Sequence, residues 1–383
     1  MTRDARLMAL AFLLMGIGEG LLMFFHPLYL QQEFRASPVQ IGEILGLAGG
    51  ALALVLVPVG VLADRIGRKP LIVSSWILQT LAALMMFEAG SIAAFTVGLI
   101  IYNLANFAMA PTQSYIAVAH GRWPVARVLT TVSSFFGTGA IIGPALGSYI
   151  VGIVGLRTVY GVAVLFFVAS TTLVLFIEPQ PVAEPAHGHR RYGRILSNNA
   201  LARLLVLAFL VSFSLFVYWP LVPNFLRGVR GVTMGEIGIL GSFYSLGWVV
   251  LALTLGRMHP RLGFLLALGL AALSVVLLWH GSGMLPLVLG YFLAGVFRTV
   301  RPLVNTQVEL LVHPEEIGLA FGLAETMGAI AVLLAAPLSG LLYSHGPDLP
   351  FPVSLGLMGV AAVLCIWCAP AGPIHTPGHP TAQ

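Results

Sequence analysis

The chain has 383 residues, of which 58% are hydrophobic and only 9% are charged, with a mean hydropathy of +0.96. A soluble domain is about 25% charged, so this composition excludes a large-cored soluble protein and indicates an integral membrane protein. The net charge of +5 is small and lies in short loops, so it indicates membrane topology rather than nucleic-acid binding.

Twelve apolar runs follow one another along the chain, and a helix needs about 20 such residues to cross the hydrocarbon core. They occupy residues 7–31, 39–63, 70–88, 91–117, 126–152, 156–178, 200–226, 234–257, 262–280, 284–311, 317–344 and 349–370. The first run is too long for the core of a signal peptide and should remain as a helix. The sequence therefore predicts an all-α integral membrane protein with twelve transmembrane helices.

A short basic segment separates the second and third predicted spans. It carries Gly60, Asp64, Arg65, Gly67, Arg68 and Lys69. These charges cannot lie in hydrocarbon, because a charge at mid-bilayer costs at least about 2.5–3.5 kcal/mol. The segment is therefore predicted to be a tight turn at the membrane surface. In this setting it resembles the loop motif between the second and third helices of the major facilitator superfamily.

This resemblance implies a secondary transporter that works by alternating access, usually as a monomer, with helices 1, 4, 7 and 10 lining a central cavity. It also implies that the loop motif is a gate. Asp64 would face the N-terminus of the eleventh helix, near residues 316–318, when the cytoplasmic side is closed.

The two halves of the chain repeat each other. A shift of 196 residues places Pro27 on Pro223, Ile41-Gly42 on Ile237-Gly238, and Gly60 on Gly256. A parallel repeat of six spans predicts two pseudo-symmetric six-helix bundles, residues 1–178 and 200–370. Residues 179–199 form the predicted linker, and residues 371–383 are expected to be a disordered tail.

Lysine and arginine residues fall mainly on one side of the predicted spans. Thirteen of the 19 lie on the side that holds both termini, and four lie on the other. By the positive-inside rule both termini are predicted to be cytoplasmic. The expected location is a plasma membrane, of the bacterial inner-membrane type.

Charged residues inside the spans are the candidates for proton coupling. Glu19 lies about twelve residues into the first span, ~18 Å deep at 1.5 Å per residue. Arg298 lies within the tenth span and must face a partner or a wet cavity. Glu325 and Glu19 are both possible partners for the arginines of the tenth span. A static salt bridge and a protonation-switched cluster both remain open. His26 shares a helix face with Glu19 and has either a similar or an interfacial role.

Polar and aromatic residues in the fourth, seventh and tenth spans are predicted to line a substrate cavity. They are Asn103, Asn106, Gln113, Tyr218, Trp219, Arg301 and Asn305. The aromatic rings would suit a lipophilic substrate, although ordinary core packing also explains them. The superfamily's antiporters usually carry an arginine in the fourth helix. This chain has none there, unless Arg298 supplies the charge from the other half.

Small residues recur every four positions in the fifth span, at Gly139, Gly143 and Gly147, with Pro144 between them. Such a face lets helices approach closely, and the proline permits a bend. The pattern resembles the fifth-helix motif of the drug:proton antiporter branch of the superfamily. A close helix crossing in any transporter explains it equally well.

The leading hypothesis is a transporter that exports a small, possibly lipophilic molecule against proton entry. An uptake symporter or uniporter of the same fold is the alternative. A multi-pass enzyme is less favoured, because no catalytic motif is present and no aspartate lies mid-membrane. No cofactor or metal is expected. The expected partners are the substrate, protons and the lipid bilayer.

Overall fold

The structure is a computed structural model that describes residues 1–54, 67–180, 198–256, 258, 260–313 and 316–368. In the first half its helices are α1 (Arg3–Met23), α2 (His26–Glu33), α3 (Pro38–Ala51), η1 (Leu52–Leu54), α5 (Arg68–Glu88), α6 (Ile92–Leu104), η2 (Ala105–Ala108), α7 (Met109–Val118), α8 (Val125–Val154) and α9 (Leu156–Leu175). In the second half they are α11 (Asn199–Tyr218), η3 (Trp219–Leu221), α12 (Val222–Gly228), α13 (Met234–Leu255), α14 (Pro260–His280), α15 (Met284–Ala294), α16 (Phe297–Glu309), α17 (Ile317–His345) and α18 (Pro350–Cys368).

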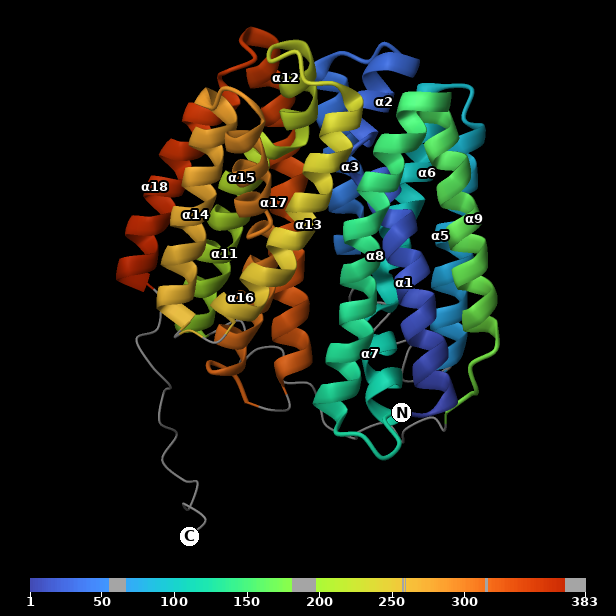
Figure 1. Cartoon of the computed structure of the whole chain (residues 1–383). Coiled ribbons are helices and arrows are strands. Elements are labelled where there is room, and N and C mark those ends of the chain that lie inside the picture. The colour runs from blue at the N-terminus through green and yellow to red at the C-terminus, as the bar shows by residue number, and fades with distance from the viewer. Residues whose placement is uncertain (55–66, 181–197, 257, 259, 314–315, 369–383) are drawn as a thin grey trace.

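Ten helical segments within these residues are long and apolar enough to cross a membrane. Two of the twelve predicted spans are not among them. The apolar part of α18, Pro350–Ile366, is shorter, and the predicted span 39–63 runs into residues 55–66, which lie outside the described residues. The helix α1 begins, and α18 ends, toward the same side of the molecule (Figure 1).

The 196-residue repeat of the sequence is matched in the structure by the N-terminal caps of two helices. At the start of α3, Ser37 and Gln40 form a capping box, and at the start of α13, Thr233 and Glu236 do the same. Each pair satisfies two backbone N–H groups that a helix leaves free at its first turn. The two capping boxes are separated by the same 196 residues that relate the halves in sequence.

The buried apolar side chains gather in two clusters, one for each half of the chain. The first comes almost entirely from α1 to α9, and the second from α11 to α18. In Figure 1 the two sets of helices stand beside each other, with α3, α8, α13 and α17 between them. A few side chains cross over, among them Phe24 into the second cluster and Leu221 into the first.

Four of the long helical segments are interrupted near their middle. The segment α1–α2 breaks at Phe24–Phe25, α6–α7 at η2, α11–α12 at η3, and α15–α16 at Gly295–Val296. These are the first, fourth, seventh and tenth predicted spans. The sequence predicts each of them as one continuous helix, although α2 and α16 are less apolar than α1 and α15 and prolines lie in the first turns of α2 and η3.

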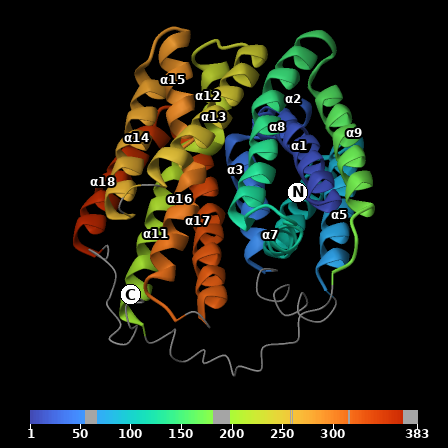
Figure 2. The same cartoon turned by 60° about the horizontal axis from the view of Figure 1, so that its bottom comes forward.

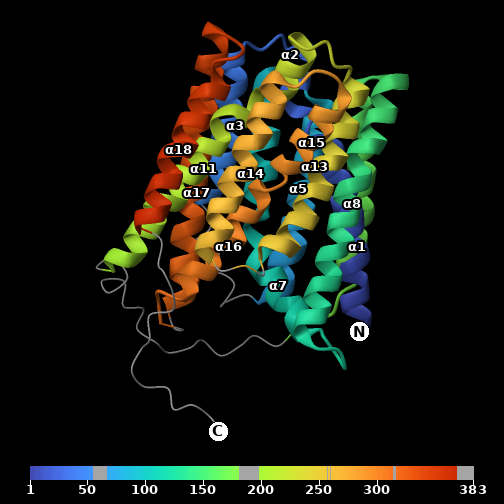
Figure 3. The same cartoon turned by 60° about the vertical axis from the view of Figure 1, so that its left-hand side comes forward.

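The halves contact each other tightly at the end of the molecule where α2 and α12 lie, which we call the α2/α12 end (Figures 1 and 3). There a Cβ on Gly42 would lie 2.3 Å from the Ala336 carbonyl oxygen, and one on Gly340 would lie 2.4 Å from that of Pro38. Such distances mean that α3 and α17 touch backbone to backbone. Toward the opposite, N-terminal end, a Cβ on Gly318, Gly322 or Gly328 of α17 would meet nothing within 4 Å.

The glycines of the fifth predicted span lie where α8 crosses α1. A Cβ on Gly139 would lie 2.2 Å from the Leu13 carbonyl oxygen, and one on Gly143 would lie 2.4 Å from that of Ile17. From the other side, Gly20 meets the ring of Pro144 at 2.7 Å. Gly147 faces the ring of Phe25. Small residues at these positions therefore allow the closest helix crossing of the first half.

Candidate functional site

A pair of opposite charges joins the two halves deep within the helices. Arg298 Nη2 on α16 donates to Glu19 Oε1 on α1, and it also contacts Met23 Sδ at 3.5 Å. The side chains are 27% and 21% exposed, respectively. Because a single charge at this depth is costly, each residue serves as the other's counter-charge. The structure thus pairs Arg298 with Glu19, and the other predicted partner, Glu325, pairs with Arg301.

Small residues on both helices set the position of this pair. On α1, Gly16 and Gly20 flank Glu19 and lie against the backbone and proline ring of α8. In the second half of the chain, a Cβ on Gly295 would lie 2.2 Å from the backbone nitrogen of Trp248. The break at Gly295 therefore brings the start of α16 directly onto α13, and Arg298 follows three residues later.

The ring of Trp248 packs against the guanidinium group of Arg298. The guanidinium carbon of Arg298 is 4.9 Å from the centroid of the Trp248 ring, within the range of a cation–π contact. Phe136 of α8 meets the same ring edge-on, with centroids 6.0 Å apart. The arginine is thus held by a carboxylate from one half and an aromatic face from the other.

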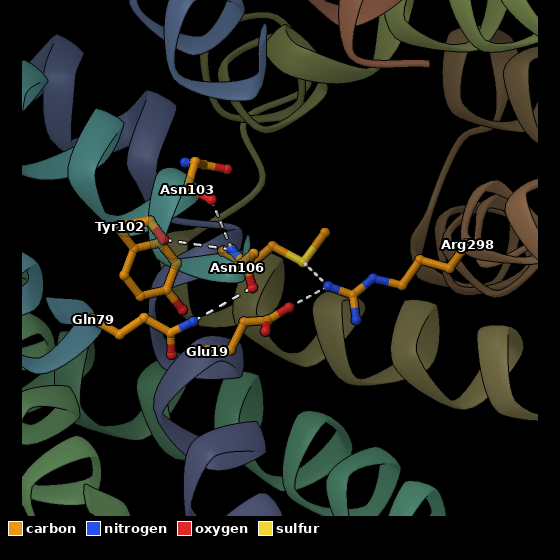
Figure 4. A network of polar contacts seen from close by, with 7 residues as sticks. Glu19, Gln79, Tyr102, Asn103, Asn106 and Arg298 are labelled. Atoms are coloured by element: carbon orange, nitrogen blue, oxygen red, sulfur yellow. Dashed lines mark hydrogen bonds and ion pairs between the residues drawn. The ribbon is translucent and has the colours of Figure 1, made fainter. Parts of the chain in front are cut away.

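Amide side chains lie on the far side of Glu19 from Arg298, as Figure 4 shows. Gln79 Nε2 donates to Asn106 Oδ1 at 3.4 Å, and Asn106 Nδ2 reaches the carbonyl oxygens of Tyr102 and Asn103 at 3.4 and 3.3 Å. Asn103 itself donates to the Leu99 carbonyl oxygen at 2.9 Å. Asn106 lies in the helix break η2, Asn103 lies just before it in α6, and Gln79 comes from α5.

The hydroxyl of Ser75 supports that break. Its Oγ donates to the Ala105 carbonyl oxygen at 2.6 Å, and both groups are buried. A helix break leaves carbonyl groups without their usual N–H partner, and in a membrane protein water is not at hand to replace it. Ser75 therefore stabilises η2, and with it the position of Asn106.

A second ion pair lies on the same helix, nearer the N-terminal end. Arg301 Nε donates to Glu325 Oε1 of α17, and the arginine side chain remains 51% exposed. Beyond it, α16 exposes Thr306 and Glu309, and Asn305 in part. A face this polar does not suit lipid. Figure 2 turns the molecule so that this end comes forward.

The remaining candidates are more scattered. Gln113 is exposed on α7, further toward the N-terminal end than Asn106. Trp219 begins η3 and stacks on Tyr244 with centroids 4.9 Å apart. Tyr218 is only 1% exposed and packs against Phe297, so in this state it belongs to the core of the second half rather than to an open cavity.

His26 is separated from the charge pair by the break in α1. Its Nδ1 lies 2.9 Å from the Tyr160 hydroxyl, and its ring packs on Phe95 in the core of the first half. The predicted common face of Glu19 and His26 assumed one continuous helix, and the break at Phe24–Phe25 removes that assumption.

The loop motif is described only at its end. Gly60, Asp64 and Arg65 lie outside the described residues. Gly67 has φ = 81°, a backbone conformation that favours glycine, and it precedes the first residue of α5. Arg68 donates to Gln180 Oε1 at 3.0 Å, while Lys69 follows it in the first turn.

Gln79 was missed by the sequence analysis, although the signal was present. It is an uncharged amide in the middle of an otherwise apolar span, and it is only 2% exposed. The rule that polar groups inside membrane helices mark functional or structural contacts applies to amides as well as to charges.

Comparisons with known proteins agree on one family. The sequence model of the Major Facilitator Superfamily matches residues 8–213 and 204–382, which together cover most of the chain. The "Bicyclomycin resistance protein homolog" of Haemophilus influenzae is 25% identical over 228 residues, which are 55% of this chain and 55% of that protein. The "Multidrug resistance protein MdtG" of Enterobacter lignolyticus is 26% identical over 53% of this chain and 51% of that protein. The chain thus spans about half the length of these two curated relatives.

The fold is shared with solved transporter structures. A single-residue variant of the nucleoside transporter NupG superposes with a TM-score of 0.80 at 16% identity, over 95% of this chain and 98% of that one. The human organic anion transporter MFSD10 gives a TM-score of 0.67 at 19% identity, over 95% and 99% of the two chains. At these identities the likeness establishes the architecture alone.

Proposed function

Because the chain belongs to the major facilitator superfamily, and is a multi-pass membrane transporter rather than an enzyme, we propose that it exports a small lipophilic molecule in exchange for protons. The observation that carries this proposal is the ion pair between Glu19 and Arg298. It joins the two halves of the chain, lies deep within the helices, and contains a carboxylate that a proton neutralises.

The proposed coupling follows from the charges of the pair. When Glu19 takes a proton, Arg298 loses its counter-charge and keeps its contacts to the ring of Trp248 and to Met23 Sδ. The contact that favours the present arrangement of the halves is then weakened, and the other arrangement gains in population. A substrate that engages either charge has the same effect. Proton and substrate therefore compete for one pair, which is the requirement for exchange.

The position of Arg298 bears on the absence of an arginine from the fourth helix. No lysine or arginine occurs in α6, η2 or α7. The positive charge beside Glu19 comes instead from the second half of the chain. In our proposal Arg298 therefore takes the part that a fourth-helix arginine has in related antiporters.

Export is proposed because relatives of this chain are named for resistance to bicyclomycin and to multiple drugs. The aromatic rings of Trp248 and Trp219, which are each partly exposed, offer apolar contact surface near the charge pair. Together these favour a lipophilic substrate that carries at least one polar or charged group.

We further propose a twelve-span monomer with both termini in the cytoplasm of a bacterial-type cell, made of two bundles joined by the linker 179–199. The distribution of lysine and arginine supports this orientation. The α2/α12 end then faces outward, and the structure is closed outside and open to the cytoplasm. Gly60, Asp64 and Arg65 would belong to the cytoplasmic gate together with Gly67, Arg68 and Lys69.

The test uses purified protein in liposomes that contain a pH-sensitive dye, with ethidium as a lipophilic aromatic probe. Antiport predicts ethidium-dependent proton movement opposite to the movement of the probe. Glu19→Gln should abolish this proton movement, since an amide cannot take up the proton. Glu43→Gln should preserve it, because Glu43 is an exposed glutamate at the side of α3.

The alternative is an uptake symporter or uniporter, which the lack of a basic residue in the fourth predicted span favours. In the same liposomes a symporter moves protons in the direction of the probe, and a uniporter moves the probe with no protons. Either outcome would refute exchange while leaving the transporter assignment intact.

A further inference from the structure

Two adjacent phenylalanines at the break between α1 and α2 enter opposite halves of the molecule. Phe25 is fully buried in the cluster of the first half, where its ring faces Gly147. Phe24 is 3% exposed and belongs to the cluster of the second half. A continuous helix would turn these neighbours by only about 100°, so the break is what separates them. The first half thus inserts one ring into the other half.

The ring of Phe24 occupies a pocket made of three aromatic side chains. Its centroid lies 5.4 Å from that of Tyr244, 6.2 Å from that of Tyr291 and 6.5 Å from that of Trp219. The ring fits because position 241 is glycine: a Cβ there would lie 2.5 Å from Phe24 Cδ2. The pocket therefore has space for this one ring and no further side chain.

The second half makes the reciprocal insertion. Leu221, at the end of η3, is 1% exposed and belongs to the cluster of the first half. The 196-residue shift that relates the two halves places Phe25, beside Phe24, on Leu221. Equivalent breaks in the first and seventh predicted spans thus each send one apolar side chain across the interface.

Phe24 lies directly beside the charge pair, on its α2/α12 side. Met23 precedes it and contacts Arg298, while Glu19 lies about 7.5 Å lower along the helix axis at 1.5 Å per residue. Beyond Phe24, Asn224 of α12 donates to the Pro27 carbonyl oxygen and to Gln31 Oε1, at 3.3 and 2.6 Å. The ring is therefore the first apolar barrier between the charge pair and the α2/α12 end.

We propose that Phe24 is the gate residue that closes the transport path at the α2/α12 end. Its ring is seated among Gly241, Tyr244, Trp219 and Tyr291 while that end is closed, and it leaves the pocket when the end opens. The proposal requires alternating access, which the family implies. It does not depend on the direction of transport, on the substrate or on proton coupling.

The physical basis is the cost of withdrawing the ring. Opening the α2/α12 end takes a phenyl ring out of a dry aromatic pocket and exposes it, and the pocket, to water. Removing the Phe24 ring, or filling the pocket that holds it, lowers the cost of opening and shifts the equilibrium toward the open state. Cavity formation elsewhere in the core does not have this directional effect.

The test measures how fast a buried cysteine at the α2/α12 end reacts with a membrane-impermeant maleimide, in purified protein. The reporter is Ser148→Cys, in a background with Cys365 and Cys368 replaced by serine. Ser148 on α8 is 9% exposed, and its Oγ donates to the Gly235 carbonyl oxygen of α13 at 2.5 Å. Its exposure therefore requires that the halves separate at this end.

We expect Phe24→Ala to raise the labelling rate about tenfold, because the barrier to opening falls with the loss of one buried ring. Gly241→Ala keeps the ring but blocks its seat, and it should act in the same direction. Phe95→Ala, which deletes a fully buried ring that packs on Tyr29 and Tyr160 in the core of the first half, should leave the rate unchanged. Gly269→Ala on α14 is the control for Gly241→Ala, since a Cβ there meets nothing within 4 Å.

Two results would overturn the proposal. The first is wild-type labelling in both Phe24→Ala and Gly241→Ala. The second is an equal increase in Phe95→Ala, which would mean general loosening rather than gating. If Phe24→Ala does not fold, Gly241→Ala alone decides between these outcomes. None of them bears on the proton measurements in liposomes, so this proposal and the proposed function fail separately.

Discussion

At the residue scale, the charge pair shows how a membrane protein keeps ionised groups at depth. Glu19 and Arg298 are each partly exposed, and the guanidinium of Arg298 also contacts Met23 and Trp248. Removing one member leaves the other charge without compensation in a low-dielectric setting, whereas removing both does not. The pair should therefore behave as a unit.

This predicts non-additive effects on stability. Arg298→Gln should cost about 2 kcal/mol, below the about 3–5 kcal/mol of a fully buried pair because both side chains keep some exposure. Adding Glu19→Gln should restore much of the loss, since no unpaired charge remains. The measurement is thermal unfolding of the single and double variants in detergent. A double variant less stable than Arg298→Gln would contradict the account.

The sequence predicted the charges of the site but not their pairing. Mid-span Glu19, Arg298, Arg301 and Glu325 stand out in apolar runs, because charges are expensive there. Which arginine meets which glutamate depends on how the halves dock, and Glu19 and Arg298 are 279 residues apart. Phe24 carried no signal at all, since an apolar residue in an apolar run looks the same whether it enters its own core or the opposite one.

At the element scale, close helix crossings and helix breaks determine where the site residues lie. The capping boxes and the 196-residue repeat make the starts of α3 and α13 predictable from sequence. The breaks at Phe24–Phe25, η2, η3 and Gly295–Val296 were missed, although Pro27 and Pro220 lie beside two of them and α16 is much less apolar than α15. The hydroxyl of Ser75 stabilises η2 through a tertiary contact.

The crossing of α1 and α8 predicts a sharp difference between two glycines of one helix. Gly139→Ala places a Cβ 2.2 Å from the Leu13 carbonyl oxygen and must push the helices apart, whereas at Gly152 a Cβ meets nothing within 4 Å. Overpacking costs about 1–3 kcal/mol. Gly139→Ala should therefore lower the melting temperature by several degrees and Gly152→Ala should not. Equal melting temperatures would show that the crossing tolerates a methyl group.

The break at η2 makes a second pair of predictions. Ser75→Ala removes the only hydroxyl that the described residues offer to the Ala105 carbonyl oxygen, at a cost of about 1 kcal/mol. Ser74→Ala is the matched control, because that exposed hydroxyl bonds Leu71 of its own helix. Thermal unfolding of both variants tests this. Equal loss in the two would mean that Ser75 does not stabilise the break.

At the scale of the whole molecule, the described residues form two packed cores that meet through α3, α8, α13 and α17. The α2/α12 end is closed by backbone contacts and by Phe24, and the polar face of α16 lies toward the N-terminal end. The family fold was predictable from a ten-residue loop and the number of apolar runs. The particular state was not, because two arrangements of the halves use the same sequence.

The central claim is that a proton on Glu19 releases the contact that favours this arrangement. The most direct measurement is the distance between spin labels at Thr130→Cys on α8 and Gly318→Cys on α17, exposed positions near the N-terminal end, with the native cysteines replaced. Glu19→Gln removes the negative charge as a proton would, so it should shift the distances toward shorter values than in the wild type at the same pH. Glu43→Gln, at an exposed position on α3, should keep the wild-type distances. If Glu19→Gln also keeps the wild-type distances, the coupling lies elsewhere.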